Sequence, residues 1–126
     1  MAKIIKGRMI NKTPMVRAGI KHGKLVIGKG PYFITVDSGF NGDLSVPSVV
    51  LDQLDVEYAG TMNFQLADGS IVEKDLWYGD VIIGKLIVDV LMIEGDFLLG
   101  MELAEDIFSS FLIDFDNKIV ALELRE

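Results

Sequence analysis

The chain has 126 residues, 50% of them hydrophobic, and carries a formal net charge of -7 with a pI near 4.6. This length suits one globular domain with one core, so we treat residues 1–126 as a single domain. The absence of cysteine excludes disulfides and thiolate chemistry, and the acidity argues against nucleic-acid binding, because phosphates require a basic surface.

Residues 1–30 form a basic segment within this acidic chain. They hold eight of the twelve Lys and Arg residues and no Asp or Glu. The cations alternate with apolar residues, as they do on a half-buried strand. We therefore predict an N-terminal β segment whose charge complements the acidic remainder, with a basic arm for an acidic partner as the alternative.

The sequence gives no sign of a membrane protein. The first eight residues lack the apolar run of a signal peptide, and the most apolar stretch, residues 81–93, is interrupted by Lys85 and Asp89. We expect a soluble, cytoplasmic protein without a membrane partner.

Short segments rich in Ile, Val, Leu and Phe, separated by glycines, predict a mostly β fold. In the first part of the chain we expect strands at residues 4–10, 15–20, 24–27 and 32–36, with turns at Asn11-Lys12 and His22-Gly23. Pro47, which suits the first turn of a helix, precedes apolar residues in a helical repeat. A short helix is therefore predicted after it.

The second part of the chain predicts hairpins. Asp68-Gly69 separates two β-like runs, residues 61–66 and 71–77, and Asp-Gly between such runs is a strong hairpin signal. Further pairs are expected at residues 81–83 with 86–93 and at 111–115 with 118–124. A second short helix is predicted over residues 101–108. The sequence therefore predicts an all-β fold with two short helices.

Metal and phosphate sites receive little support. His22 is the one histidine, so we expect no metal and no cofactor. Asp114 and Asp116 share a strand face but border a turn, where solvated acids are ordinary. Gly28-Lys29-Gly30 lacks the remaining residues of a phosphate loop and is interpreted as a turn.

One acid stands in an unusual position. Residues 34–40 run an apolar strand directly into Asp37, Ser38 and Gly39. A carboxylate at the end of a buried strand is costly to desolvate unless hydrogen bonds or a shared proton compensate. Asp37 is therefore a candidate functional acid, and an ordinary Asp-Ser-Gly turn is the alternative.

Four motifs extend this pattern over residues 30–116. They are Val36-Asp37-Ser38-Gly39-Phe40-Asn41-Gly42, Leu44-Ser45-Val46-Pro47, Leu66-Ala67-Asp68-Gly69-Ser70 and Asp96-Phe97-Leu98-Leu99-Gly100-Met101. In this order and spacing they resemble the retropepsin-like aspartic proteases, particularly their small microbial single-domain members. The resemblance implies a retropepsin-like β-barrel, closed or open, that acts as a two-fold homodimer.

The resemblance also implies roles for individual residues. Asp37 would be the catalytic aspartate, Ser38 the hydroxyl that braces the paired loops, and Gly39 a point of close backbone approach. Leu98, Leu99 and Gly100 would pack beneath that loop, whereas Phe40, Asn41, Asp68 and Gly69 would contact substrate, the last two as part of a flap. Retroviral enzymes usually have Thr in place of Ser38 and Ala in place of Phe40, and the second difference alters the wall of the cleft.

This chemistry requires two carboxyl groups around one water, and the chain contains a single Asp-Ser/Thr-Gly motif. A symmetric homodimer would supply the second group. We thus expect an aspartic endopeptidase that cleaves an extended polypeptide. Phe40, Phe64 and Trp77 are conceivable pocket residues, although sheet packing is favoured for Trp77 and Tyr78. Core packing is favoured for Met62, Met92 and Met101.

Two alternatives remain. The first is a catalytically silent dimerisation or peptide-binding module of the same fold. The second is an unrelated small β-barrel that binds an acidic or small ligand through its basic segment. The second alternative leaves the ordered series of motifs unexplained.

Overall fold

The computed structural model describes residues 3–22, 25–27, 33–54 and 56–125, with the backbone alone for His22 and residues 25–27. These residues are mostly β, as the sequence predicts. In chain order the elements are β1 (Ile4–Ile10), β2 (Thr13–Arg17), β3 (Gly19–His22), β4 (Leu25–Ile27), β5 (Phe33–Val36), β6 (Leu44–Val46), α1 (Ser48–Leu54), β7 (Glu57–Gln65), β8 (Ile71–Ile83), β9 (Leu86–Glu94), β10 (Leu98–Leu99), α2 (Met101–Ile107), β11 (Phe108–Asp114) and β12 (Ile119–Leu124).

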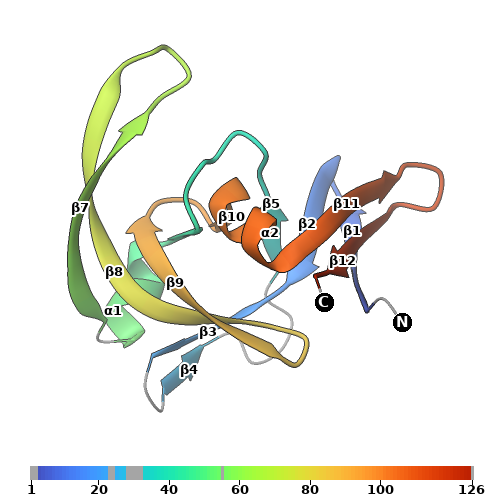
Figure 1. Ribbon diagram of the computed structural model, residues 1–126, viewed down its shortest axis with the longest axis horizontal. Helices are drawn as coiled ribbons and strands as arrows, with labels where there is room; N and C mark the ends of the chain where they lie inside the picture. The colour runs from blue at the N-terminus through green and yellow to red at the C-terminus, as the bar shows by residue number, and fades with distance from the viewer. Residues whose placement is uncertain (1–2, 23–24, 28–32, 55, 126) are drawn as a thin grey trace.

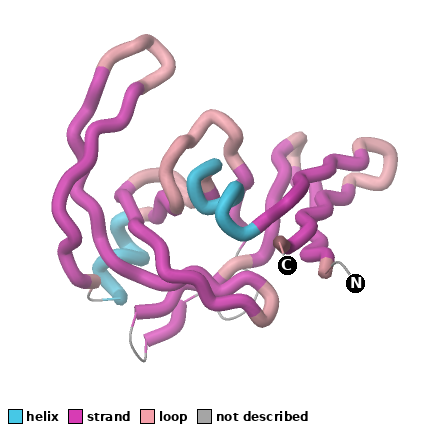
Figure 2. Tube along the Cα trace, in the orientation of Figure 1, coloured by secondary structure: helices cyan, strands magenta, loops and turns pink. Residues whose placement is uncertain are grey.

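All these strands belong to one strongly bent sheet (Figures 1 and 2). Its strand order is β11-β12-β1-β2-β5-β10-β6-β9-β8-β3-β4, and β7 pairs with β8 outside this path. The end strands β11 and β4 do not pair with each other, so the described part of the chain forms an open sheet. The all-β prediction is confirmed at this level.

The turn predicted at Asn11-Lys12 and the helix predicted after Pro47 are both present in the structure. Asn11 and Lys12 form the turn after β1 with φ of 49° and 65°. Helix α1 begins directly after Pro47, whose carbonyl oxygen accepts hydrogen bonds from the N–H groups of Val50 and Leu51 (3.0 and 3.3 Å). The predicted turns at Gly23 and at residues 28–30 lie outside the described residues.

Strand β8 differs most from the prediction. The sequence indicates two strands, residues 71–77 and 81–83, but β8 continues through both and pairs with β7, β9 and β3. Gly79 is buried within it, and a Cβ there would lie 2.9 Å from the sulfur of Met92. This glycine therefore provides room for a core side chain instead of ending the strand.

The core lies between the layers of the bent sheet and extends beneath α1 and α2. Its central members, each 0% exposed, come from α1 and from strands far apart in the sequence: Val16, Ile34, Leu44, Val46, Leu54, Val81, Ile83, Met92, Leu99, Val120 and Leu122. Because these strands meet through one core, the loops at their ends have fixed relative positions.

The basic N-terminal segment contributes inner strands of the sheet. β1 lies between β12 and β2, and β2 pairs with β5. The guanidinium groups of Arg8 and Arg17 both lie over the Phe33 ring, 5.4 and 5.5 Å from its centroid. These cations are therefore used partly in packing against an aromatic ring. Neither helix in the described ranges is long and apolar enough to cross a membrane.

Candidate active site

The loop that carries Asp37 joins β5 to β6. Strand β10 lies between these two strands, parallel to β5 with Leu99 opposite Val36, and antiparallel to β6 with Leu99 opposite Leu44. The strand that leads into Asp37 and the strand that leaves its loop are thus joined through Leu98 and Leu99.

Backbone hydrogen bonds fix both sides of this loop to the β10 segment. Asp37 N–H donates to the Leu99 carbonyl (3.0 Å), and Gly100 N–H donates to the Asp43 carbonyl (2.9 Å). Met101 N–H donates to the Phe40 carbonyl (2.8 Å). The structure therefore brings residues 98–100 and the Asp37 loop together, although about 60 residues of sequence separate them.

Gly100 permits the closest approach in this region. A Cβ at this position would overlap the Gly42 carbonyl oxygen and would lie 2.7 Å from Cδ2 of Phe40. Only a residue without a side chain fits here without moving the loop.

Asp37 is half-buried at the end of β5, whereas Ser38 and Gly39 are exposed at the tip of the loop. Its Oδ1 accepts the Gly39 N–H (2.8 Å), and its carbonyl accepts the Phe40 N–H (3.2 Å). This turn holds the carboxylate in a set orientation at an accessible edge of the molecule. Such a group can accept a proton from a water or bind a cation.

The β7–β8 hairpin protrudes from the body, and its tip lies on the same side as the Asp37 loop in Figure 1. Asp68 Oδ1 accepts hydrogen bonds from the N–H (2.9 Å) and hydroxyl (2.6 Å) of Ser70, which lower the pKa of Asp68 below its usual value. Gly69 takes φ of +88°, which favours glycine. Asp68 and Gly69 thus shape the tip, and neither lines the two cavities described next.

Two adjoining cavities lie between the hairpin and the Asp37 loop. The first, the hairpin cavity, has a volume of about 320 Å³ and runs from Gly39 to Leu66 and Ala67. The second, the acidic cavity, has a volume of about 310 Å³ and reaches Asp43, Glu102 and Asp106. Both are lined by Phe40, Asn41, Met62, Phe64 and Ile93.

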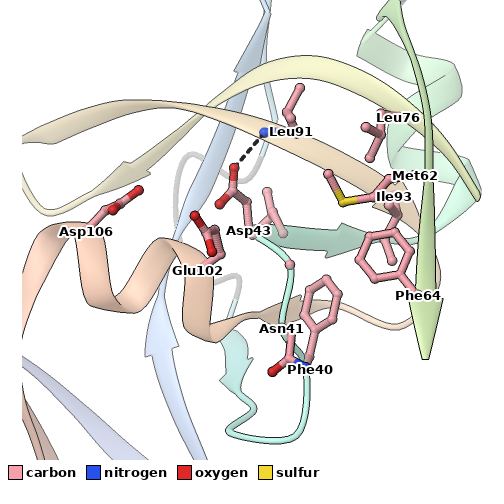
Figure 3. A pocket seen from close by; sticks show the side chains of 12 residues that line it. Phe40, Asn41, Asp43, Met62, Phe64, Leu76, Leu91, Ile93, Glu102 and Asp106 are labelled. Carbon is pink, nitrogen blue, oxygen red and sulfur yellow. Dashed lines mark hydrogen bonds between the residues drawn. The ribbon is translucent and has the colours of Figure 1, made fainter. Parts of the chain in front are cut away.

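Asp43 lies where the loop meets β9. Its Oδ2 accepts the Leu91 N–H (3.0 Å), as Figure 3 shows. Burial raises the pKa of this carboxyl, the Leu91 N–H opposes the rise, and the nearby Asp106 carboxylate adds to it. In the same view Glu102 and Asp106 project from α2 on the side of the cavity away from Phe64.

Some predicted side-chain roles were wrong and others agree with the structure. Met62, expected in the core, is 46% exposed and lines both cavities, whereas Met92 is fully buried. Phe40 and Phe64 meet at the cavities with ring centroids 6.2 Å apart. Trp77 packs edge-on against Tyr58 (5.3 Å) and lines neither cavity, which agrees with the favoured sheet packing.

Sequence reasoning missed Asp43, Glu102 and Asp106. Glu102 and Asp106 are four residues apart, a spacing that places them on one face of a helix, and this was the available signal. Asp114 accepts hydrogen bonds from Asn117 and acts as the expected turn residue. No group of three or more His, Cys, Asp and Glu side chains in the described ranges is arranged to hold a metal ion.

Comparisons of the chain with models of protein families, with curated proteins and with solved structures found no match.

Proposed function

We propose that this chain is one subunit of a homodimeric aspartic endopeptidase with a retropepsin-like architecture, in which each subunit supplies Asp37. The observation that carries the proposal is the bracing of the Asp37 loop by residues 98–101. This bracing presents one oriented carboxylate beside a protruding hairpin and two cavities. The motifs that resemble this family thus occupy one connected region of the structure.

The proposed reaction uses two carboxyl groups around one water. An ionised carboxylate accepts a proton from the water as it attacks the peptide carbonyl, and a protonated carboxyl donates a hydrogen bond to the carbonyl oxygen. In aspartic proteases the two groups share one proton, because like charges about 3 Å apart do not both ionise. Asp37 of one subunit fills one role and its symmetry mate fills the other.

Two features support a symmetric contact between two copies of the chain. The loop tip, Ser38 and Gly39, is exposed, so a two-fold axis beside it places each tip against its own copy. β11 is an end strand of the sheet with exposed Phe111 and Leu112, and its turn to β12 extends to the right of the Asp37 loop in Figure 1. An end strand with apolar side chains is suited to pairing with another chain.

The substrate in this proposal is an extended polypeptide between the hairpins and the Asp37 loops. Among the described strands, β7 pairs with β8 alone and lies outside the path of the sheet, so its other edge is available for added-strand hydrogen bonds. Alternate substrate side chains would enter the hairpin cavity and the acidic cavity.

Cleavage of casein, a largely unfolded protein, at about pH 5 tests this function directly. We expect cleavage that pepstatin inhibits and that Asp37→Asn abolishes. Asp89→Asn, which alters an exposed acid on β9 that lines neither cavity, is the matched control and retains activity. Light scattering of the same preparations is expected to give the mass of a dimer.

Two outcomes contradict the proposal. A dimer that cleaves nothing under any condition favours the silent peptide-binding module. A strictly monomeric protein at high concentration removes the second carboxyl group and with it the mechanism.

A further inference from the structure

The acidic cavity combines an apolar interior with carboxylates along one side. Its apolar lining comes from the loop, β6, the hairpin and β9: Phe40, Leu44, Met62, Phe64, Leu76, Leu91 and Ile93. Its volume of about 310 Å³ is at the lower end of the range for small-molecule sites, which suits a single large side chain. The volume and lining therefore suit a mostly apolar group.

The ionisable groups that line this cavity are all acidic. They are Asp43 from the loop and Glu102 and Asp106 from α2, and none of the described Lys, Arg and His residues belongs to the lining. Glu102 and Asp106 are exposed, and by themselves they would form an ordinary solvated helix face. Asp43 differs, because it is half-buried within the cavity wall and is fixed by the Leu91 N–H.

No described Lys, Arg or His side chain lines the cavity to offset the charges of Asp43, Glu102 and Asp106. Asp43 and Asp106 are close enough for the Asp106 charge to disfavour ionisation of Asp43, and burial acts in the same direction. A cation in the cavity would relieve both effects. An anionic group would add repulsion, and a purely apolar group would leave the carboxylates desolvated without a partner.

The cavity also lies in the path of a bound polypeptide. It shares five lining residues with the hairpin cavity, which extends to Gly39 at the tip of the Asp37 loop. A side chain of a polypeptide held beneath the hairpin can therefore reach the carboxylates of α2 while its backbone lies near Asp37.

From this arrangement, and resting on the proposed peptidase function, we infer that the acidic cavity is a specificity pocket for a Lys or Arg side chain of the substrate. The aliphatic stem packs against Phe40, Met62 and Phe64. The charged end reaches Asp43, Glu102 and Asp106, since long basic side chains bury their stems and leave the charge at a polar boundary.

Binding to the Asp37→Asn chain tests the pocket without requiring catalysis. Three fluorescein-labelled peptides serve as probes; they differ only at one central residue, which is Lys, norleucine or Glu. Norleucine keeps the apolar stem and lacks the charge. Fluorescence anisotropy at neutral pH is expected to show about tenfold tighter binding of the Lys peptide than of the norleucine peptide, as for a hydrogen bond to a charged group. The Glu peptide should bind weakest.

Charge-neutralising variants then locate the effect. Glu102→Gln and Asp106→Asn, each combined with Asp37→Asn, should reduce the preference for Lys about threefold or more. Glu105→Gln is the matched control, because Glu105 is on the same helix and does not line the cavity. The control should leave the preference unchanged.

Mapping of casein cleavage sites by mass spectrometry separates this inference from the proposed function. Cleavage that depends on Asp37 but shows no enrichment of Lys or Arg at any fixed position, together with equal binding of the Lys and norleucine peptides, overturns the specificity pocket and leaves the peptidase standing. Selective binding of the Lys peptide without cleavage supports the pocket and contradicts the peptidase. Equal loss of Lys preference in Glu105→Gln and Glu102→Gln also overturns the pocket.

Discussion

Replacement of Gly100 by Ala provides a strong test of the packing between the β10 segment and the Asp37 loop. The Gly100 backbone, with φ of -92° and ψ of 172°, is open to any L residue, so the cost is steric. The new Cβ would overlap the Gly42 carbonyl oxygen and lie 2.8 Å from the Gly42 carbonyl carbon. Because these are backbone atoms, the loop itself must move.

The expected loss of stability follows from two contributions. Overpacking costs about 1–3 kcal/mol. Moving the loop also weakens the hydrogen bonds that Gly100 and Met101 donate to it, at about 0.5–1.5 kcal/mol each. We expect Gly100→Ala to lower the free energy of unfolding by about 2–6 kcal/mol in all. Cleavage should fall about 100-fold, as expected for a misplaced catalytic group.

Urea unfolding at one fixed protein concentration, followed by Trp77 fluorescence, measures the change, since dimerisation makes apparent stability concentration-dependent. Gly69→Ala is the control: a Cβ there meets no heavy atom within 4 Å, so only its φ of +88° adds a cost, about 1–2 kcal/mol. A Gly100→Ala variant within about 0.5 kcal/mol of the wild type would refute the described packing.

Three further predictions concern the loop and the dimer. An approximately ninefold excess of Asp37→Asn subunits, equilibrated with the wild type, should reduce cleavage to about one tenth, because most wild-type subunits then lie in mixed dimers; unchanged activity would indicate a catalytic monomer. Ser38→Ala should lower cleavage about tenfold and Ser38→Thr should retain it, since threonine keeps the hydroxyl; equal activity of both variants would contradict the bracing role. The raised pKa of Asp43 means that the folded chain binds more protons than the unfolded chain above pH 3.8, so this group's contribution to stability falls as pH rises through the folded pKa. The free energy of unfolding of Asp43→Asn, relative to that of the wild type, should therefore increase from acidic to neutral pH when both are measured by urea unfolding. A difference that does not change with pH would contradict this reasoning.

Elements governed by local chemistry could be predicted from the sequence. Asp68-Gly69 forms the tip of the β7–β8 hairpin because glycine accepts the positive φ. Pro47 precedes α1 because its missing N–H and fixed φ suit a helix start. In both cases a few neighbouring residues determine the conformation.

Non-local arrangements could not be predicted from the residue pattern. Nothing in Leu98-Leu99 specifies that β10 lies between β5 and β6, because the pairing depends on strands that are more than 50 residues away in the sequence. Gly79 looks like a break, yet it is buried beside Met92 in a continuous strand. Only the resemblance to a known family placed residues 98–100 beneath the Asp37 loop.

The acidic cavity depends on tertiary structure in the same way. Asp43 and Asp106 are ordinary acids in the sequence, and their proximity follows from the packing of α2 beside the loop. Met62 was wrongly predicted to lie in the core, because its apolar character suggests burial. The protruding hairpin leaves it exposed at the cavities. The hydrophobic pattern of a sequence does not distinguish an apolar side chain at a binding surface from one in the core.

A crystal structure of the assembled protein would show whether two copies of Asp37 form one site. We predict a two-fold dimer in which the two Asp37 carboxylates lie within hydrogen-bonding reach of one water. An assembly that holds these side chains far apart, each surrounded by bulk solvent, would contradict it.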